Sequence, residues 1–258
     1  MAAMIRISFT VATMTISFTK TRETTIYGDE GNDRIVDSGG YNDLNGGDGN
    51  DYISNYDSAK MYGDAGNDTM RGENGSYVMY GGDGNDIIRV FSNGDNSLDG
   101  GNDNDTLSYS GAGKATMAGG LGNDTISGGD GNDKIYGNDG DDIIESGSGK
   151  DTLDGGFGAD TYLYKSITDS LASNRDIIVT FDSGEDKFDF KSLHLDSFIG
   201  ESAFSGTGEK EIRYTKYDTH DSHTDYMQVQ VDADGNGTAD MNIRVDQFGD
   251  LNTSDFML

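Results

Sequence analysis

The chain contains no cysteine, no proline and no tryptophan in its 258 residues. Without cysteine there are no disulfides, no thiolate metal sites and no cysteine nucleophiles. No segment reaches the roughly 18 apolar residues that a membrane-spanning helix needs. Basic residues are also scarce, with 18 Lys and Arg against 47 Asp and Glu and a net charge of −29. This balance argues against a nucleic acid partner, because phosphate binding needs a basic surface.

The chain is instead rich in aspartate and glycine, with 39 Asp, 8 Glu and 39 Gly. A merely soluble acidic surface would use Glu freely, since Glu is the better helix former. Asp and Gly together are typical of turns and of short-armed oxygen ligands. With 33% hydrophobic residues and strong self-repulsion, the bare chain is expected to collapse poorly. These features favour a hard cation as the partner.

The glycines and aspartates follow a nine-residue repeat between residues 28 and 163. Residues 46–54 read Gly-Gly-Asp-Gly-Asn-Asp-Tyr-Ile-Ser, and the same frame returns at 81–89, 119–127, 128–136, 137–145 and 155–163. Fifteen repeats cover the segment, and their turns begin at 28, 37, 46, 55, 63, 72, 81, 91, 100, 110, 119, 128, 137, 146 and 155. The repeat at 55 is one residue short, and Val90 and Tyr109 are single insertions.

The eighth residue of every repeat is apolar or aromatic. It reads Ile35, Leu44, Ile53, Met61, Met70, Met79, Ile88, Leu98, Leu107, Met117, Ile126, Ile135, Ile144, Leu153 and Tyr162. One inward-pointing residue in each short strand buries little by itself, so the repeats must stack to build a core. The pattern therefore predicts a solenoid.

The complete repeats have the form Gly-Gly-x-Gly-x-Asp-x-U-x, where U is apolar, and they resemble the RTX family. This resemblance implies an all-β protein built around a parallel, calcium-binding β-roll. It also implies that successive repeats lie on opposite edges, that two repeats make one coil, and that calcium lies between stacked turns of the same edge.

The sixth position distinguishes the two edges. It reads Asp33, Asn42, Asp51, Lys60, Asp68, Tyr77, Asp86, Asn96, Asp105, Ala115, Asp124, Asp133, Asp142, Asp151 and Asp160. Every second repeat keeps its Asp, whereas the intervening repeats lack it until the turns at 128 and 146. The sequence thus predicts an asymmetric roll, with about seven ions between the turns of one edge and one or two on the other, so that seven to nine Ca²⁺ bind in all.

Aspartate and glycine in this arrangement suit calcium, which takes six to eight oxygen ligands. Asp offers two oxygens on a short arm, and Gly at the first, second and fourth positions allows positive φ, which turns carbonyl groups toward one point. The candidate ligands are Asp33, Asp51, Asp68, Asp86, Asp105, Asp124, Asp133, Asp142, Asp151 and Asp160, with Gly47, Gly49, Gly82, Gly84, Gly120, Gly122, Gly129, Gly131, Gly156 and Gly158 in their turns. An isolated cluster of this kind could be an ordinary turn. Like charges stacked at strand spacing need a counter-ion, however, so the repeat predicts the metal.

The segments that flank the roll are expected to be β-rich. Residues 5–19 alternate between apolar and polar residues, which predicts an edge strand or cap in an N-terminal segment (1–26), or the ragged start of a truncated longer protein. A signal peptide is the competing interpretation, but a charged segment followed by a smooth apolar run and a small-residue cleavage site is not found. The roll is predicted over 27–163 and a third segment over 164–258. Residues 177–181 and 186–190 are predicted strands of that third segment.

The third segment resembles the C-terminal domain of serralysin-type metalloproteases, and its first strands also resemble the calcium modules of alginate epimerases. The matches to the serralysin-type domain include residues 198–200, 203–207, 212–214 and 232–240, and the final residues 254–258 resemble that family's uncleaved type I secretion signal. The resemblance implies export through the type I secretion machinery, an extracellular location, and no catalytic domain in this chain.

Two further motifs carry less information. Asp232, Asp234, Asn236 and Gly237 match the first half of an EF-hand loop, but Ile243 stands where the bidentate Glu is required, so we expect a Gly-rich hairpin with at most a weak calcium site. His220 and His223 lie in a polar loop without helical periodicity, which favours a solvated loop over a zinc site.

The sequence therefore predicts a secreted, non-catalytic calcium-binding module, because neither a His-Glu-x-x-His helix nor a Gly-x-Ser-x-Gly elbow is present. Two alternatives remain open. The chain could be the C-terminal part of a larger secreted metalloprotease or polysaccharide-modifying enzyme, or it could be an extracellular adhesin or glycan-binding roll.

Overall fold

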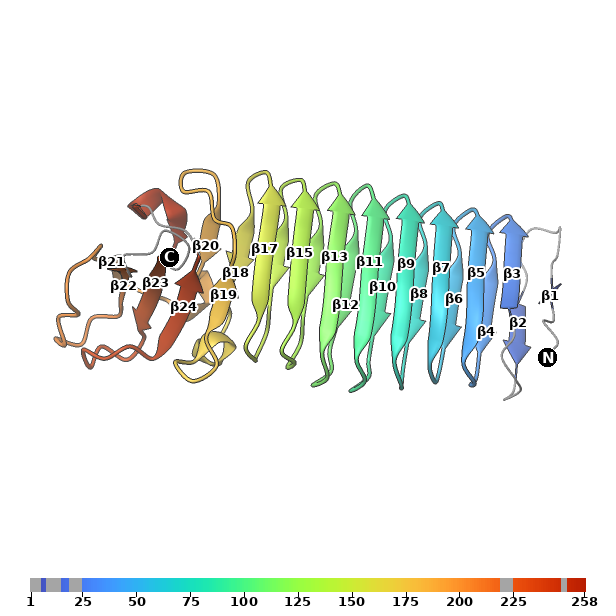
Figure 1. Ribbon diagram of the computed structural model, residues 1–258, viewed down its shortest axis with the longest axis horizontal. Helices are drawn as coiled ribbons and strands as arrows, with labels where there is room; N and C mark the ends of the chain where they lie inside the picture. Colours follow the sequence, from blue (N-terminus) through green and yellow to red (C-terminus); the bar gives the residue numbers. More distant parts are fainter. Residues whose placement is uncertain (1–5, 8–14, 19–24, 219–224, 247–249) are drawn as a thin grey trace.

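The computed structural model describes residues 6–7, 15–18, 25–218, 225–246 and 250–258, which form an all-β rod (Figure 1). Successive strands of the repeats alternate between two long sheets, so that each coil contributes one strand to each sheet. Neighbouring coils pair in parallel, as in Met61 with Leu44 and Ile88 with Met70. The predicted parallel β-roll followed by a β-rich C-terminal part is confirmed.

Sheet A contains fourteen strands among the described residues. In spatial order they are β1 (Arg6–Ile7), β3 (Thr25–Glu30), β5 (Asn42–Asp48), β7 (Ala59–Ala65), β9 (Tyr77–Asp83), β11 (Asn96–Asn102), β13 (Ala115–Leu121), β15 (Lys134–Asp139), β17 (Thr152–Phe157), β19 (Asp176–Ile178), β24 (Met241–Val245), β23 (Tyr226–Asp232), β22 (Glu211–Tyr217) and β21 (Ser197–Phe198).

In the part of the chain that the structure describes, sheet B contains eleven strands. They are β2 (Thr15–Phe18), β4 (Arg34–Asp37), β6 (Tyr52–Asn55), β8 (Thr69–Gly72), β10 (Ile87–Val90), β12 (Thr106–Tyr109), β14 (Thr125–Ser127), β16 (Ile143–Glu145), β18 (Thr161–Leu163), β20 (Lys187–Asp189) and β25 (Phe256–Met257). Three short 3₁₀ helices lie in the described C-terminal part, η1 (Ile167–Ser170), η2 (Lys191–Leu193) and η3 (Thr253–Asp255).

The turns between the sheets form two edges of the rod. The Asp edge consists of the turns that lead from sheet A to sheet B and begin at 28, 46, 63, 81, 100, 119, 137 and 155. The opposite edge consists of the turns that lead back to sheet A and begin at 37, 55, 72, 91, 110, 128 and 146. Each strand of the roll pairs with the strand two places along the chain, so that β3 pairs with β5 and β4 with β6. Successive repeats therefore lie on opposite edges, as predicted.

The core of the roll is built from the eighth residue of every repeat. All fifteen of these side chains are 0–1% exposed, from Ile35 to Tyr162. They point inward because alternate residues of a strand face opposite sides of the sheet. The predicted inward column is therefore confirmed.

The repeat at 55 corrects one assignment in the sequence analysis. Ala59, and not Lys60, pairs with Asn42 on one side and with Tyr77 on the other, so Ala59 occupies the sixth position. The residue missing from this repeat is thus lost from the turn before Ala59, and Lys60 moves to the outward-facing seventh position.

The two sheets continue beyond residue 163 with a different core. β19 and β20 extend sheets A and B respectively, each in parallel with the last coil, so the two strands expected near 177–181 and 186–190 lie in opposite sheets. Aromatic rings replace the aliphatic column in this part of the core. The ring centroids of Phe188 and Phe181 are 4.6 Å apart, and those of Phe256 and Phe198 are 4.5 Å apart. β22, β23 and β24 then pair antiparallel.

We predict that the inward column contributes most of the packing energy of the roll. Leu107 is 0% exposed and lies in register between Ile88 and Ile126, so Leu107→Ala should lower the free energy of unfolding by about 2–5 kcal/mol. Thr106→Ala, on the outward side of the same strand, is the matched control and should change it by less than about 0.5 kcal/mol. Equal losses for both variants, measured by denaturant unfolding in calcium, would contradict the packing argument.

Candidate metal centre

All ten aspartates proposed as ligands are buried, with exposures between 0 and 5%. Eight lie on the Asp edge directly before a strand of sheet B. The other two, Asp133 and Asp151, lie on the opposite edge before strands of sheet A. The sixth position is held inside the turn because the strand that follows places the eighth residue in the core, and the sixth residue shares its face.

In nine of these carboxylates, all but that of Asp33, one oxygen accepts a hydrogen bond from the coil before. The backbone N–H of Asp51 donates to Asp68 Oδ1 at 2.7 Å, and that of Asp68 donates to Asp86 Oδ1 at 2.7 Å. The same bond recurs along both edges, with the acceptors Asp51, Asp105, Asp124, Asp142 and Asp160 on the Asp edge and Asp133 and Asp151 on the opposite edge.

The second oxygen of the same nine carboxylates is buried and meets no hydrogen-bond donor. This holds for the Oδ2 atoms of Asp51, Asp68, Asp86, Asp105, Asp124, Asp133, Asp142, Asp151 and Asp160. A buried acceptor without a donor costs about 1–3 kcal/mol, and more when it is charged. Such a regular series of orphaned oxygens indicates that a positively charged group belongs there.

On the Asp edge, a carbonyl oxygen of the next coil lies near the same point as the orphaned carboxylate oxygen at the turns that begin with Gly46, Gly63, Gly81, Gly100, Gly119 and Gly137. At the turn that begins with Gly81, Asp86 Oδ2 and Gly100 O both lie within 3.0 Å of the point where a Cβ on Gly81 would stand. The parallel pairing skips Gly81 and Gly100, since Tyr80 pairs with Asp99 and Gly82 with Gly101. Oxygens from two stacked turns therefore converge without a donor between them, which fits an ion that binds oxygens at roughly 2.3–2.6 Å.

The glycines of the turn have two different roles. Gly82 at the second position and Gly84 at the fourth have φ values of 119° and 114°, which favour glycine. Gly47, Gly49, Gly120, Gly122, Gly129, Gly156 and Gly158 share this conformation, but Gly131 does not. The expectation of positive φ at the first position is wrong, because Gly81 and its equivalents are required for space and not for φ.

Burial raises the pKa of the stacked carboxylates. It raises the pKa of Asp105 to about 8, with repulsion from Asp86, Asp124 and Asp103 adding to the shift. Burial raises the pKa of Asp142 and Asp151 to about 7, and the pKa of Asp51, Asp68, Asp86, Asp124, Asp133 and Asp160 to about 6. In the absence of a cation, the folded chain therefore favours the protonated, neutral form of these carboxyl groups.

The fifth residue of the repeat, treated as a spacer in the sequence analysis, forms a second ladder. The backbone N–H of Asn50 donates to Asn32 Oδ1 at 2.9 Å, and that of Asn67 donates to Asn50 Oδ1 at 2.8 Å. The series continues through Asn85, Asn104, Asn123, Asp141 and Ala159. It runs opposite to the aspartate ladder, so successive coils are clasped in both directions. The recurrence of Asn at the fifth position of the repeat is the sequence feature that could have predicted this ladder.

Two aspartates missed by the sequence analysis end the ladders. Asp186 Oδ1 accepts from Asp160 N–H at 2.9 Å on the Asp edge, and Asp176 Oδ1 accepts from Asp151 N–H at 3.0 Å on the opposite edge. Their second oxygens are satisfied within the chain, by Asp182 N–H at 2.8 Å and by the Ser146 hydroxyl at 3.2 Å. Both precede an apolar residue by two positions, as Asp does in the repeat, and this spacing could have identified them.

The predicted Gly-rich hairpin is present between β23 and β24. Carboxylate oxygens of Asp232, Asp234 and Asp240 lie within 4.8 Å of one another, but Asp232 accepts backbone N–H groups of its own loop, including Gly237 at 2.7 Å. His220 and His223 lie outside the described residues. No helix in the described part of the chain is long and apolar enough to cross a membrane.

Comparisons with known proteins identify a family. The family model described as peptidase M10 serralysin C terminal matches residues 11–258. The solution structure of the AlgE6R3 subunit of the Azotobacter vinelandii mannuronan C5-epimerase is similar at 24% identity, covering 62% of this chain and 78% of that one, with a TM-score of 0.42. None of the curated proteins compared matches this chain.

We predict that a methyl group at the first glycine of a turn disrupts the converging oxygens. In Gly81→Ala the new Cβ would lie within 3.0 Å of Asp86 Oδ2 and Gly100 O, so the free energy of unfolding in calcium should fall by about 1–3 kcal/mol. Ala65→Ser, at the third position of the neighbouring turn, is the control and should unfold like the unmodified protein. Denaturant unfolding in calcium measures both, and an unaffected Gly81→Ala would contradict the tight approach.

The raised pKa values predict how the calcium-free fold responds to pH. The folded chain holds protons that the unfolded chain releases, so this stabilisation is complete below about pH 4 and is lost as the pH rises through about 6 to 8. Circular dichroism of the calcium-free protein should thus show more β-structure at pH 5 than at pH 8, and saturating calcium should remove this difference. More β-structure at pH 8 without calcium would contradict the argument.

Proposed function

The chain belongs to the serralysin C-terminal family of peptidase M10, and we propose that it is a secreted, non-catalytic calcium-binding module whose folding is coupled to calcium. The matched model describes the C-terminal part of serralysins and not their catalytic domain. The observation that carries the proposal is the series of buried Oδ2 atoms from Asp51 to Asp160 that meet no hydrogen-bond donor.

The Asp edge supplies the ligands of the proposed sites. Each gap between stacked turns offers a carboxylate oxygen of one turn and a carbonyl oxygen of the next, as with Asp105 Oδ2 and Gly119 O. Calcium would contribute the positive charge that these oxygens lack. In the folded chain, the hydrogen bonds to aspartate Oδ1 atoms and those to asparagine Oδ1 atoms hold successive turns in register, and the ligand oxygens with them.

Gaps between the eight turns of the Asp edge would hold about seven ions, and Asp133 and Asp151 would hold one or two more on the opposite edge. The proposed number is thus seven to nine Ca²⁺. Each ion offsets two negative charges, so this number would compensate about half of the net charge of −29.

The proposed coupling follows from linkage, because an ion that binds only the folded chain adds its binding free energy to folding. Sites with dissociation constants of about 0.1–1 mM, as in extracellular modules, would be empty in a cytosol poor in calcium and filled outside the cell. The chain would then cross the type I secretion machinery expanded, guided by its C-terminal residues, and would fold outside. The family membership supports this route.

We further propose that residues 27–163 act as the calcium-binding roll, that residues 164–258 cap it, and that residues 1–26 add a strand or cap at its other end. Within the third segment, β25 pairs with β20 at the end of sheet B, and the Phe256 side chain is 7% exposed. A closing strand and an export signal are compatible functions for these residues, since the signal would be read before the chain folds.

A second candidate is that the chain is the C-terminal part of a larger secreted enzyme. The matched family model favours this possibility, because it is named for one terminus of a peptidase. The coding sequence upstream of Met1 would decide between the two, since a reading frame with a catalytic domain is expected only for the larger enzyme.

Calcium titration followed by circular dichroism tests the main proposal. We expect little β-structure at neutral pH without calcium, a cooperative gain at roughly 0.1–1 mM calcium, and a return to the initial spectrum with a chelator. Magnesium at the same concentration is the control and should be far less effective, because it demands octahedral geometry and retains its waters. A full β-spectrum without calcium that the chelator leaves unchanged would overturn the proposal.

A further inference from the structure

Five turns of the opposite edge lack an aspartate at the sixth position, yet a buried polar side chain lies in each of these turns or directly before it. These turns begin at 37, 55, 72, 91 and 110, and the side chains are Asn42, Asn55, Tyr77, Asn96 and Tyr109, which are 0–6% exposed. Buried polar groups of this kind are expected to make hydrogen bonds. Their partners show how these turns close.

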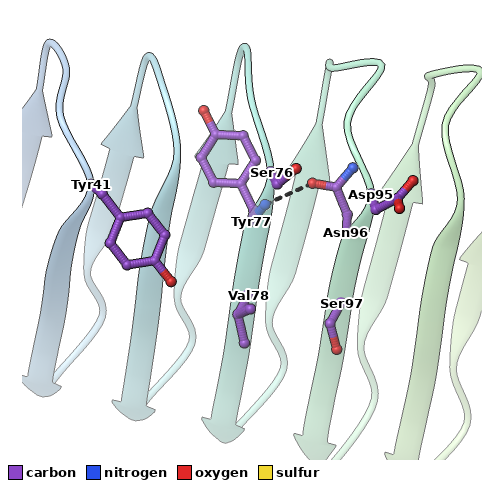
Figure 2. A pocket seen from close by; sticks show the side chains of 7 residues that line it. All are labelled: Tyr41, Ser76, Tyr77, Val78, Asp95, Asn96 and Ser97. Carbon is purple, nitrogen blue, oxygen red and sulfur yellow. Dashed lines mark hydrogen bonds between the residues drawn. The ribbon is translucent and has the colours of Figure 1, made fainter.

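Asn96 and Asp133 occupy the same position of the same edge and differ in one atom. Oδ1 of each accepts a backbone N–H from the coil before, from Tyr77 at 2.9 Å and from Ala115 at 2.7 Å; Figure 2 shows the former bond. Asp133 Oδ2 meets no donor, whereas Asn96 Nδ2 donates to Gly94 O at 2.6 Å. The amide group of Asn96 thus donates directly to a carbonyl oxygen. A carboxylate at this position could be joined to that carbonyl only through a cation, because both groups are acceptors.

Tyr77 fills the corresponding space with a ring. A Cβ on Gly72 would meet the Tyr77 ring, whereas a Cβ on Gly63, the equivalent residue of the Asp edge, would meet Asp68 Oδ2. The Tyr77 hydroxyl donates to Asn55 O at 3.0 Å and accepts from Glu73 N–H at 3.0 Å. It therefore satisfies backbone groups of two successive turns.

Tyr109 closes the next turns in the same way, from the preceding strand. Its hydroxyl accepts from Gly113 N–H at 2.8 Å and donates to Gly94 O at 3.2 Å. Gly94 O therefore receives two donors, one from Asn96 and one from Tyr109, which fill both of its lone pairs. No acceptor capacity remains there for a cation.

The first turns of this edge use asparagine. Asn42 Nδ2 donates to Asp37 Oδ2 at 2.5 Å, and Asn55 Nδ2 donates to the same oxygen at 2.7 Å. Asp37 is buried, at 1% exposure, and its carboxylate is thus stabilised by two amides from successive coils. Asn55 also accepts from Asp57 N–H at 2.8 Å, which closes its own turn.

We infer that Asn42, Asn55, Tyr77, Asn96 and Tyr109 determine which turns take no calcium, because they supply from within the chain the donors that the other turns would obtain from an ion. This inference rests on the proposed function, since it assigns the orphaned oxygens elsewhere to calcium. The opposite edge then has metal sites only from the turn at 128 onward. Its earlier turns are held together by side chains of the protein itself, which cannot dissociate as an ion can.

Removal of single hydroxyl groups tests the inference. Tyr77→Phe and Tyr109→Phe should each lower the midpoint of thermal unfolding in saturating calcium by about 2–4 °C, because the backbone groups of these turns lose their hydrogen bonds to the hydroxyl. The number of ions bound per chain, measured by equilibrium dialysis and atomic emission, should stay at the unmodified value. Tyr80→Phe is the matched control, because Tyr80 is 41% exposed, and it should change neither quantity.

Aspartate variants of the same edge complete the test. Asp133→Asn and Asp133→Ala should both bind one ion fewer, but Asp133→Asn should keep the higher thermal midpoint, because its amide supplies a donor as Asn96 does. An ion lost from Tyr77→Phe or Tyr109→Phe, thermal midpoints equal to that of Tyr80→Phe, or equal midpoints for both Asp133 variants would each overturn the inference. If the unmodified protein binds no calcium, the proposed function fails. The midpoints of thermal unfolding of Tyr77→Phe and Tyr109→Phe would still show whether the two hydroxyl groups stabilise their turns.

Discussion

The whole roll depends on how buried oxygens in its turns find a positive partner. Parallel coils at a spacing of about 4.8 Å place the same residue of each repeat directly above its equivalent, so any charge is repeated along the edge. On the Asp edge this creates a file of carboxylates whose Oδ2 atoms have no donor, and burial raises the pKa of Asp105 to about 8. Packing at the eighth position can hold the coils together only if this repulsion is relieved.

The structure contains two solutions to the same problem. The Asp edge leaves the converging oxygens open to a cation, and two side-chain ladders of opposite direction keep the turns in register. The opposite edge places amide and phenol groups at the equivalent points, as with Asn96 and Tyr77. At the C-terminal end both ladders stop at aspartates, Asp186 and Asp176, whose second oxygens are satisfied by the chain itself. The roll thus joins a cap that needs no ion at this point.

This arrangement explains why folding and ion binding are expected to be one event on the Asp edge. The inward column from Ile35 to Leu153 supplies one buried apolar side chain at the eighth position of each repeat, which is a narrow apolar core for a chain with a net charge of −29. Phe188 and Phe256 instead stack their rings in the core of the C-terminal part. The roll therefore combines a narrow apolar column with a long series of carboxylate oxygens that meet no donor.

The amino-acid sequence alone determined the solenoid, its inward column and the two unlike edges, because a period of nine residues fixes which side chain recurs at each point of a coil. It also predicted the ten buried aspartates, since the sixth and eighth residues share a strand face. It did not reveal the alignment of Ala59, the ladder of asparagines such as Asn50, the endings at Asp176 and Asp186, or the donors on the opposite edge. These features depend on which coil lies above which and on where a side chain of one repeat reaches in the next. Such contacts join residues about 18 positions apart in the chain, and only the stacked structure brings them together.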